Sequence, residues 1–127
     1  MKILLDTNFI LTCVKQKIDF ANLANELFDE KINWIVPQQV LNELGNLKDR
    51  AGMKREDKNA AELSFEILQT INPQIVDLGR NPNVDIGIVN YILNTDIVLA
   101  TLDRGLKNRI NNRILTIRNF KTLEIIQ

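Results

Sequence analysis

The chain has 127 residues, of which 45% are apolar, and its 16 basic and 16 acidic residues give a net charge of zero. This length suits one domain. The balanced charge argues against nucleic-acid binding by the surface as a whole, although it permits a local basic face. The sequence contains no His, which excludes catalysis by imidazole and every zinc site that needs it. Any catalysis must therefore use carboxylates, hydroxyls, amines or a metal ion.

Cysteine usage and hydropathy indicate a cytoplasmic protein. The single Cys13 lies in an apolar stretch, where a buried thiol is the usual outcome, and it allows no disulfide framework. No apolar run approaches the roughly 20 residues of a membrane-spanning helix, and the N-terminus lacks the apolar region of a signal peptide. We therefore expect no association with a membrane.

Predicted strands and helices alternate along the chain. Short apolar runs predict strands at 3–5, 33–36, 75–76, 96–100 and 114–117, with a further edge strand at 123–126. Helical spacing of apolar residues predicts helices at 7–14, 19–30, 38–48, 56–71, 85–94 and 106–112, and 79–83 is expected to be a turn-rich loop. This alternation predicts one α/β domain over 1–127 with a mostly parallel sheet. In such sheets ligands bind beyond the carboxyl ends of the strands.

Four acidic residues stand out against this arrangement. Asp6 and Asp103 follow predicted strands, Asp85 begins a predicted helix, and Glu43 lies about 60° from the apolar Val40 around another. Taken alone, each Asp is explained by helix capping, and Glu43 by solvation or a nearby Lys. Capping does not explain Glu43. It also does not explain why Asp6 and Asp103 both follow the ends of predicted strands. If the strands are neighbours, the carboxylates repel one another unless a cation or proton intervenes, and oxygen ligands favour Mg²⁺ or Mn²⁺.

The motifs around these acids resemble those of PIN-domain ribonucleases. They are L-D-T-N-F-I-L at 5–11, V-P-x-x-V-L-N-E-L at 36–44, V-D at 84–85 and V-L-A-T-x-D-x-x-L at 98–106. They span nearly the whole chain in the order of that family. The chain most resembles the compact archaeal branch near the nuclease of ribosomal small-subunit processing, and VapC-type toxins are more distant relatives.

The resemblance implies a three-layer α/β/α fold with a central, mostly parallel sheet, and a Mg²⁺- or Mn²⁺-dependent endoribonuclease. It places the metal-binding and catalytic acids at Asp6, Glu43, Asp85 and Asp103, and supporting polar residues at Asn8 and Thr101. Two departures bear on the metals. Relatives often carry a second acid beside the third position and Asn or Asp before the fourth, where this chain has Val84, Ile86 and Leu102. We therefore expect one firmly held ion and one weakly held ion.

A basic segment follows the last acid. Residues 104–121 contain six basic side chains and no acid. Either this is solvated surface, or it is a phosphate track that leads RNA to the metals, in which case Arg104, Lys107 and Arg109 bind RNA. Trp34 is expected in the core, and no aromatic platform for stacking single-stranded bases is evident.

Rival interpretations fit the sequence less well. A dinucleotide-binding fold needs a Gly-rich turn where this chain has Thr7-Asn8-Phe9, and a receiver domain needs an acidic neighbour of Asp6. The alternative that stays open is a PIN-like protein that binds RNA or an assembly partner with little or no cleavage. By analogy with PIN proteins, partners beside RNA include an antitoxin or a ribosome-assembly factor. A homodimer is also expected, with residues 18–28 as its apolar surface.

Overall fold

A computed structural model describes residues 1–80 and 83–127, and the centre of the predicted loop 79–83 lies outside these residues. The strands are β1 (Lys2–Leu5), β2 (Asn33–Pro37), β3 (Gln74–Val76), β4 (Val98–Ala100), β5 (Ile114–Arg118) and β6 (Thr122–Ile126). The helices are α1 (Thr7–Lys15), α2 (Phe20–Leu27), α3 (Gln38–Asp49), α4 (Arg55–Ile71), α5 (Val84–Ile92) and α6 (Arg104–Lys107). Every strand and helix predicted from the sequence is present, with small shifts at most of the ends.

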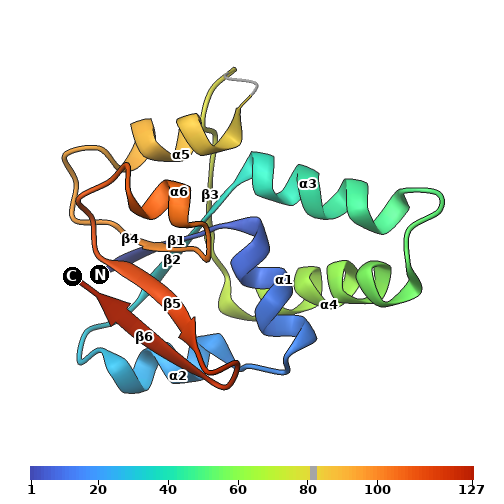
Figure 1. The fold of residues 1–127 in the computed structure, drawn as a ribbon, viewed down its shortest axis with the longest axis horizontal. Helices are drawn as coiled ribbons and strands as arrows, with labels where there is room; N and C mark the ends of the chain where they lie inside the picture. Colours follow the sequence, from blue (N-terminus) through green and yellow to red (C-terminus); the bar gives the residue numbers. More distant parts are fainter. Residues whose placement is uncertain (81–82) are drawn as a thin grey trace.

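The strands form one sheet in the order β3-β2-β1-β4-β5-β6 (Figure 1). All neighbouring pairs are parallel except β5 and β6, which form an antiparallel hairpin at the edge. The chain moves outward from β1 to β3 on one side and from β4 to β6 on the other. The change of direction therefore lies between β1 and β4, and ligands in doubly wound sheets bind at such a switch point.

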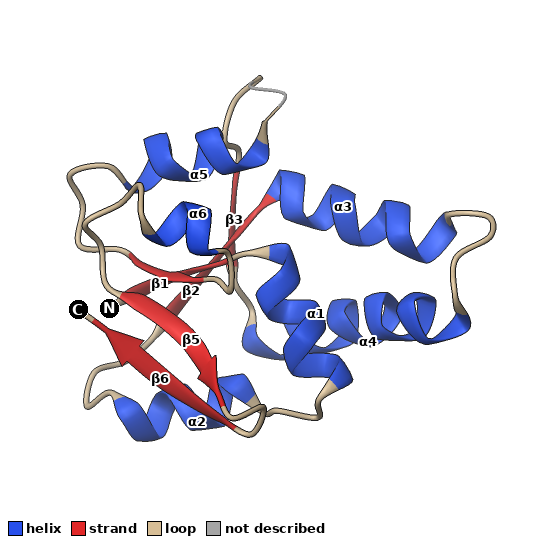
Figure 2. Cartoon of the chain, in the orientation of Figure 1, coloured by secondary structure: helices blue, strands red, loops and turns tan. Residues whose placement is uncertain are grey.

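Helices cover both faces of the sheet, as a three-layer α/β/α fold requires (Figure 2). The strand residues alternate between two apolar clusters because successive side chains point to opposite faces. Ile3 and Leu5 join the larger cluster, with buried residues of α1, α2, α3 and α4. Leu4 joins the smaller cluster, with residues of α5 and α6. Both Cys13 and Trp34 are buried in the larger cluster, which confirms these two predictions.

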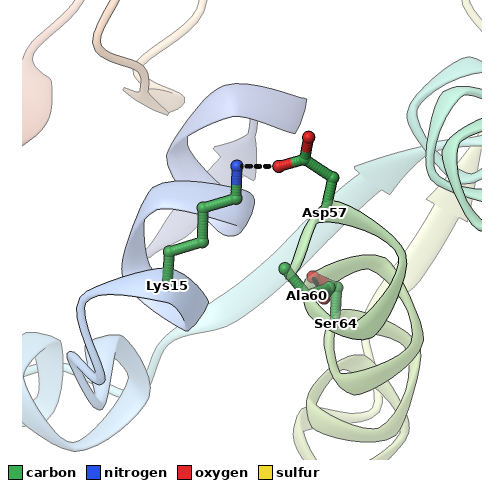
Figure 3. A network of polar contacts seen from close by, with 4 residues as sticks. All are labelled: Lys15, Asp57, Ala60 and Ser64. Atoms are coloured by element: carbon green, nitrogen blue, oxygen red, sulfur yellow. Dashed lines mark hydrogen bonds and ion pairs between the residues drawn. The ribbon is translucent and has the colours of Figure 1, made fainter. Parts of the chain in front are cut away.

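An ion pair joins α1 to α4, beside the sheet. Lys15 near the end of α1 forms an ion pair with Asp57 in the first turn of α4 (Figure 3). One helical turn beyond the buried Ala60, Ser64 is also buried and donates its hydroxyl hydrogen to the Ala60 carbonyl at 2.7 Å. Because the Ser64 hydroxyl forms its hydrogen bond within α4, this small polar residue can pack against the core without leaving an unpaired buried polar group.

The predicted helix at 106–112 is wrong in its bounds. Asp103 caps the helix by accepting hydrogen bonds from the backbone N–H groups of Gly105 and Leu106, so α6 begins at Arg104. It ends at Lys107 because the chain must return to the amino end of β5. The side-chain amide of Asn112 holds this return by donating to the carbonyl groups of Ile92, Thr95 and Ile97.

The helix predicted at 19–30, which belongs to the expected dimer surface, turns part of its apolar side inward. Phe20 and Ala24 of α2 are buried in the chain's own core, while Leu27 is exposed. No helix in the described part of the chain is long and apolar enough to cross a membrane.

Candidate metal centre at the carboxyl edge of the sheet

Each of the four predicted acids follows one of four parallel strands. Asp6 comes directly after β1, Glu43 lies in α3 after β2, Asp85 lies in the first turn of α5 after β3, and Asp103 follows β4. Strand β1 pairs with β4 in parallel, with Ile3 opposite Val98 and Leu5 opposite Ala100. Asp6 and Asp103 therefore lie at the same edge of the sheet, as the sequence predicts.

Thr101 connects Asp6 and Asp103. Its buried hydroxyl donates to Asp6 Oδ2 at 2.9 Å and accepts a hydrogen bond from the Asp103 backbone N–H at 3.1 Å. The other oxygen of Asp6, Oδ1, accepts from the backbone N–H of Thr7 at 2.9 Å. Both oxygens of Asp6 are thus oriented by the protein, one of them by Thr101.

The pKa values of Asp6 and Glu43 respond to the charges of the other acids. Burial raises the pKa of Asp6, hydrogen bonds from Thr101 and Thr7 act to lower it, and the charges of Asp85 and Asp103 raise it further. Burial likewise raises the pKa of Glu43, and the charges of Asp6 and Asp85 add to this increase. Like charges have this effect only when they lie near one another. Each of the four acids therefore lies within electrostatic reach of at least one other.

The Thr7 hydroxyl is a polar group that the sequence reasoning missed. Thr7 is buried, and its Oγ1 has no hydrogen-bond partner of good geometry among the described residues. It still lies close enough to the Glu43 carboxylate to oppose the rise of the Glu43 pKa. The sequence signal that could have identified Thr7 is its position directly after Asp6. In the structure the backbone N–H of Thr7 also donates to Asp6.

Capping and clustering turn out to coexist at this edge. Asp6 and Asp103 are the N-cap residues of α1 and α6, while the N-cap of α5 is Asn83 and not Asp85. Asn83 Oδ1 accepts from the backbone N–H groups of Asp85 and Ile86. Asp85 thus has no capping duty and lies partly exposed at the rim.

A side-chain amide also supports the loop before Asp85. Gln39 of α3 donates to Asp77 Oδ1 and to the Gly79 carbonyl, and accepts from the Leu78 backbone N–H. Gly87 of α5 packs against Leu78, and an added Cβ there would lie 3.1 Å from the Leu78 Cβ. These contacts hold the described start of the loop near α3, between Glu43 and Asp85 in the chain. Sequence patterns gave no sign of this role for Gln39.

The chemical type of the candidate ligand atoms suits a hard divalent cation. All the candidate ligands are oxygen atoms, and the ion pairs within residues 1–80 and 83–127 are Lys15–Asp57 and Arg118–Glu124, so none of the four acids has a basic partner there. In the same residues, no three acids close around a single point as they stand. Clustered carboxylates without a cationic partner, beside an orphaned Thr7 hydroxyl, are chemically suited to Mg²⁺ or Mn²⁺.

The remaining predicted site residues lie in three places. Arg104 is exposed and directly follows Asp103, and Lys107 Nζ donates to Thr116 Oγ1 on β5 at 3.3 Å. Arg109 lies elsewhere, beside a cavity that Leu93 and Asn112 line at the amino ends of β4 and β5. Asn8 is exposed and lines a cavity between α1, α3 and the start of α4. The structure therefore brings Arg104 to the acids but does not bring Arg109 there.

We call the carboxyl side of the sheet with Asp6, Glu43, Asp85 and Asp103 the acidic edge. Its raised pKa values predict that the metal-free protein loses stability as pH rises. The pKa values of Asp6 and Glu43 are raised by folding, so their favourable contribution is complete below the unfolded pKa, about 4, and is lost as pH rises through the folded pKa. Without metal, the gain in melting temperature of Asp6→Asn over wild type should therefore grow as pH rises from about 4 to 7. Thermal melting with a chelator measures this difference. A gain that does not vary with pH would contradict the prediction.

The fold and the acidic edge define a doubly wound α/β protein with a carboxylate site at its switch point. Residues 3–121 match a family model described as a PIN like domain, and the chain belongs to this family. It is 29% identical to Ribonuclease VapC4 from Methanocaldococcus jannaschii, over 98% of this chain and 95% of that protein.

Solved structures share the fold. The PIN domain endonuclease Utp24 superimposes with a TM-score of 0.78 at 23% identity, covering 98% of this chain and 90% of that one. VapBC2 from Rickettsia felis, solved with a DNA fragment from its promoter, gives a TM-score of 0.66 at 16% identity, over 91% of this chain and 98% of that one. At these identities the likeness shows the fold alone.

Proposed function

We propose that this protein is a metal-dependent endoribonuclease that hydrolyses phosphodiester bonds in RNA. The observation that carries the proposal is the placement of four acids, one after each of four parallel strands, on the carboxyl side of the sheet. Its relative VapC4, matched over nearly the full length of both chains, is named a ribonuclease.

In this proposal Asp6, Glu43, Asp85 and Asp103 hold Mg²⁺ or Mn²⁺. The bound ion supplies Lewis acidity, which lowers the pKa of water and stabilises charge on the leaving oxygen. The water oxygen bonds to phosphorus, the bond from phosphorus to a ribose oxygen breaks, and that oxygen takes up a proton. The chain's own contribution is orientation: Thr101 and the Thr7 N–H each hold one oxygen of Asp6 and so fix its carboxylate plane.

The proposal is tested by incubating single-stranded RNA with the protein in chelator, Mg²⁺ or Mn²⁺. We expect internal cleavage with either ion and none with chelator. The alternative, a PIN-like protein that binds RNA without cutting it, predicts binding and no cleavage in any metal. Cleavage that persists in excess chelator would contradict metal dependence.

For the cellular role we propose a VapC-like toxin whose antitoxin partner covers the acidic edge. The identity to VapC4 supports this role, whereas the likeness to Utp24 supports the fold and leaves ribosomal RNA processing with an assembly factor as the alternative. A toxin-like role is expected to slow growth when the protein is expressed without its partner. A small antitoxin-like reading frame next to the gene is expected as well.

Basic side chains beside Asp103 predict a salt-sensitive interaction with phosphate. Replacing Arg104 and Lys107 with Ala removes two cations next to the site, so RNA should bind more weakly and the logarithm of affinity should fall less steeply with the logarithm of salt concentration, by about one to two units of slope. Arg109→Ala with Arg113→Ala is the matched control. Arg109 lies toward the amino edge and Arg113 faces the Phe28 ring, so that pair should change the slope less. An equal change in both double variants would contradict the location of the RNA path.

A further inference from the structure

The turn between β5 and β6 carries an unusual residue. Lys121 N–H donates to the Arg118 carbonyl at 3.2 Å across this turn, and its two central residues, Asn119 and Phe120, have φ of 53° and 58°. Positive φ at both central positions is the type I′ geometry, for which Asn-Gly is the favoured sequence. Asn119 fits the first position. A bulky side chain at the second is sterically disfavoured, because Cβ crowds the neighbouring carbonyl.

The Phe120 ring does not serve the core. At 70% exposure it is the most exposed large apolar side chain among the described residues. The first and last residues of the turn, Arg118 and Lys121, are cationic and also open to solvent. Lys121 is exposed, and Arg118 is 65% exposed with its Nε 3.8 Å from Glu124 Oε2, a weak surface pair. The turn thus presents an aromatic face between two cations.

The turn also lies on the side of the sheet where the acids gather. Strand β5 runs parallel to β4, with Ala100 opposite Leu115, so its carboxyl end reaches beyond the level of Thr101 (Figure 1). Lys107 lies over β5 at Thr116, between Asp103 and the turn. A strand of RNA that leaves the acids past Arg104 and Lys107 would meet the turn next.

We propose that Phe120 is a base-stacking site for single-stranded RNA, with Arg118 and Lys121 contacting the adjacent phosphates. The inference rests on the proposed function, since it concerns the path of the same RNA. Aromatic rings stack with any unpaired base, and cations beside them neutralise the backbone. This site would supply the stacking platform that was not evident from the sequence.

The test compares three variants at Phe120 in a binding assay with chelator present, so that cleavage plays no part. The probe is a single-stranded RNA labelled with a fluorescent base. Phe120→Gly should bind about 5- to 100-fold more weakly, the range for loss of one stacked base. It should also melt higher, by about 3 °C, because Asn-Gly suits the turn. Weaker binding by a more stable protein excludes misfolding as the cause.

The other two variants separate stacking from simple apolar contact. Phe120→Trp should retain wild-type affinity, while Phe120→Leu should bind as weakly as Phe120→Gly, because only Trp offers an aromatic face. The salt dependence of Phe120→Gly should equal that of wild type, since no charge is removed. Leu93→Ala, at a 60% exposed position at the end of α5, is the control and should bind normally.

The possible outcomes are distinct. Equal affinity of wild type and Phe120→Gly overturns the inference and leaves the nuclease proposal intact. Full affinity of Phe120→Leu also overturns it, because an apolar contact without stacking would then be sufficient for binding. A wild type that binds RNA through Phe120 but never cuts it overturns the nuclease proposal alone. A wild type that does not bind RNA in chelator overturns the inference alone, because the nuclease proposal is decided by cleavage with Mg²⁺ or Mn²⁺.

Discussion

Replacing Asp6 with Asn is expected to make the metal-free protein more stable by about 1 kcal/mol and to reduce RNA cleavage by orders of magnitude. The gain in stability comes from charge. Asp6 is buried beside Asp85 and Asp103, whose charges raise its pKa, so a neutral side chain relieves repulsion. The loss of cleavage follows because the proposed ion loses a ligand.

The local structure allows this substitution. Asn caps a helix about as well as Asp, and its Oδ1 can still accept the Thr7 N–H. Its amide can donate to the Thr101 hydroxyl oxygen, which has two lone pairs and receives one hydrogen bond, from Asp103. The hydrogen bonds can therefore survive while the charge is lost.

Thermal melting with and without metal separates a ligand from a cap. Mg²⁺ at ten times its dissociation constant should stabilise wild type by about 1.4 kcal/mol and the Asn variant much less. Asp96→Asn, the same change at an exposed acid near the start of β4, is the control and should melt and cleave like wild type. Equal metal shifts and equal cleavage in the Asp6→Asn protein would leave Asp6 as a helix cap only.

The acidic edge could be predicted because parallel strands impose it. In a parallel sheet every strand exits on the same side, so acids after different strands meet if the strands are neighbours. Asp6 and Asp103 follow β1 and β4, and these strands are adjacent. The positions of the strands were readable because short apolar runs are required where both faces of a sheet are covered.

The basic segment was harder to predict, since neighbours in sequence need not share a surface. Residues 104–121 form one positive run, yet α6 ends at Lys107 and the chain then returns to the amino edge of the sheet. Arg109 and Arg113 are carried there, where the Arg113 guanidinium lies 5.9 Å from the Phe28 ring centroid. Arg118 comes back to the carboxyl side at the end of β5. Because the sequence predicts a helix that continues to 112, it assigns the basic residues at the two edges of the sheet to one surface.

Long-range side-chain contacts could not be predicted either. Gln39 and the loop 77–79 lie about 40 residues apart in the chain, and the three hydrogen bonds between them follow from packing of α3 beside the loop. No local pattern marks a glutamine for such a role. The surroundings of the Thr7 hydroxyl could not be predicted either, because they depend on where α3 places Glu43.

Replacing Phe20 with Ala is expected to destabilise the protein by about 3–5 kcal/mol, a large share of the stability of a domain of this size. Phe20 is 1% exposed and lies between two other rings. Its centroid is 5.9 Å from that of Phe9 in α1 and 5.4 Å from that of Trp34 in β2, both edge-to-face. The substitution removes both aromatic contacts and leaves a cavity beneath α1, the helix that Asp6 caps.

The same substitution at Phe120 is the matched control. Both changes remove one phenyl ring, but Phe120 is 70% exposed and has a left-handed backbone, so Phe120→Ala should alter the free energy of unfolding by less than about 1 kcal/mol. Denaturant unfolding of both variants, with the denaturant slope compared with that of wild type, measures the difference in their free energies of unfolding. RNA binding should show the reverse order at a temperature where both variants are folded, since Phe20 supports the core and Phe120 is the proposed contact. Similar losses of stability in the two variants would contradict the burial on which both assignments depend.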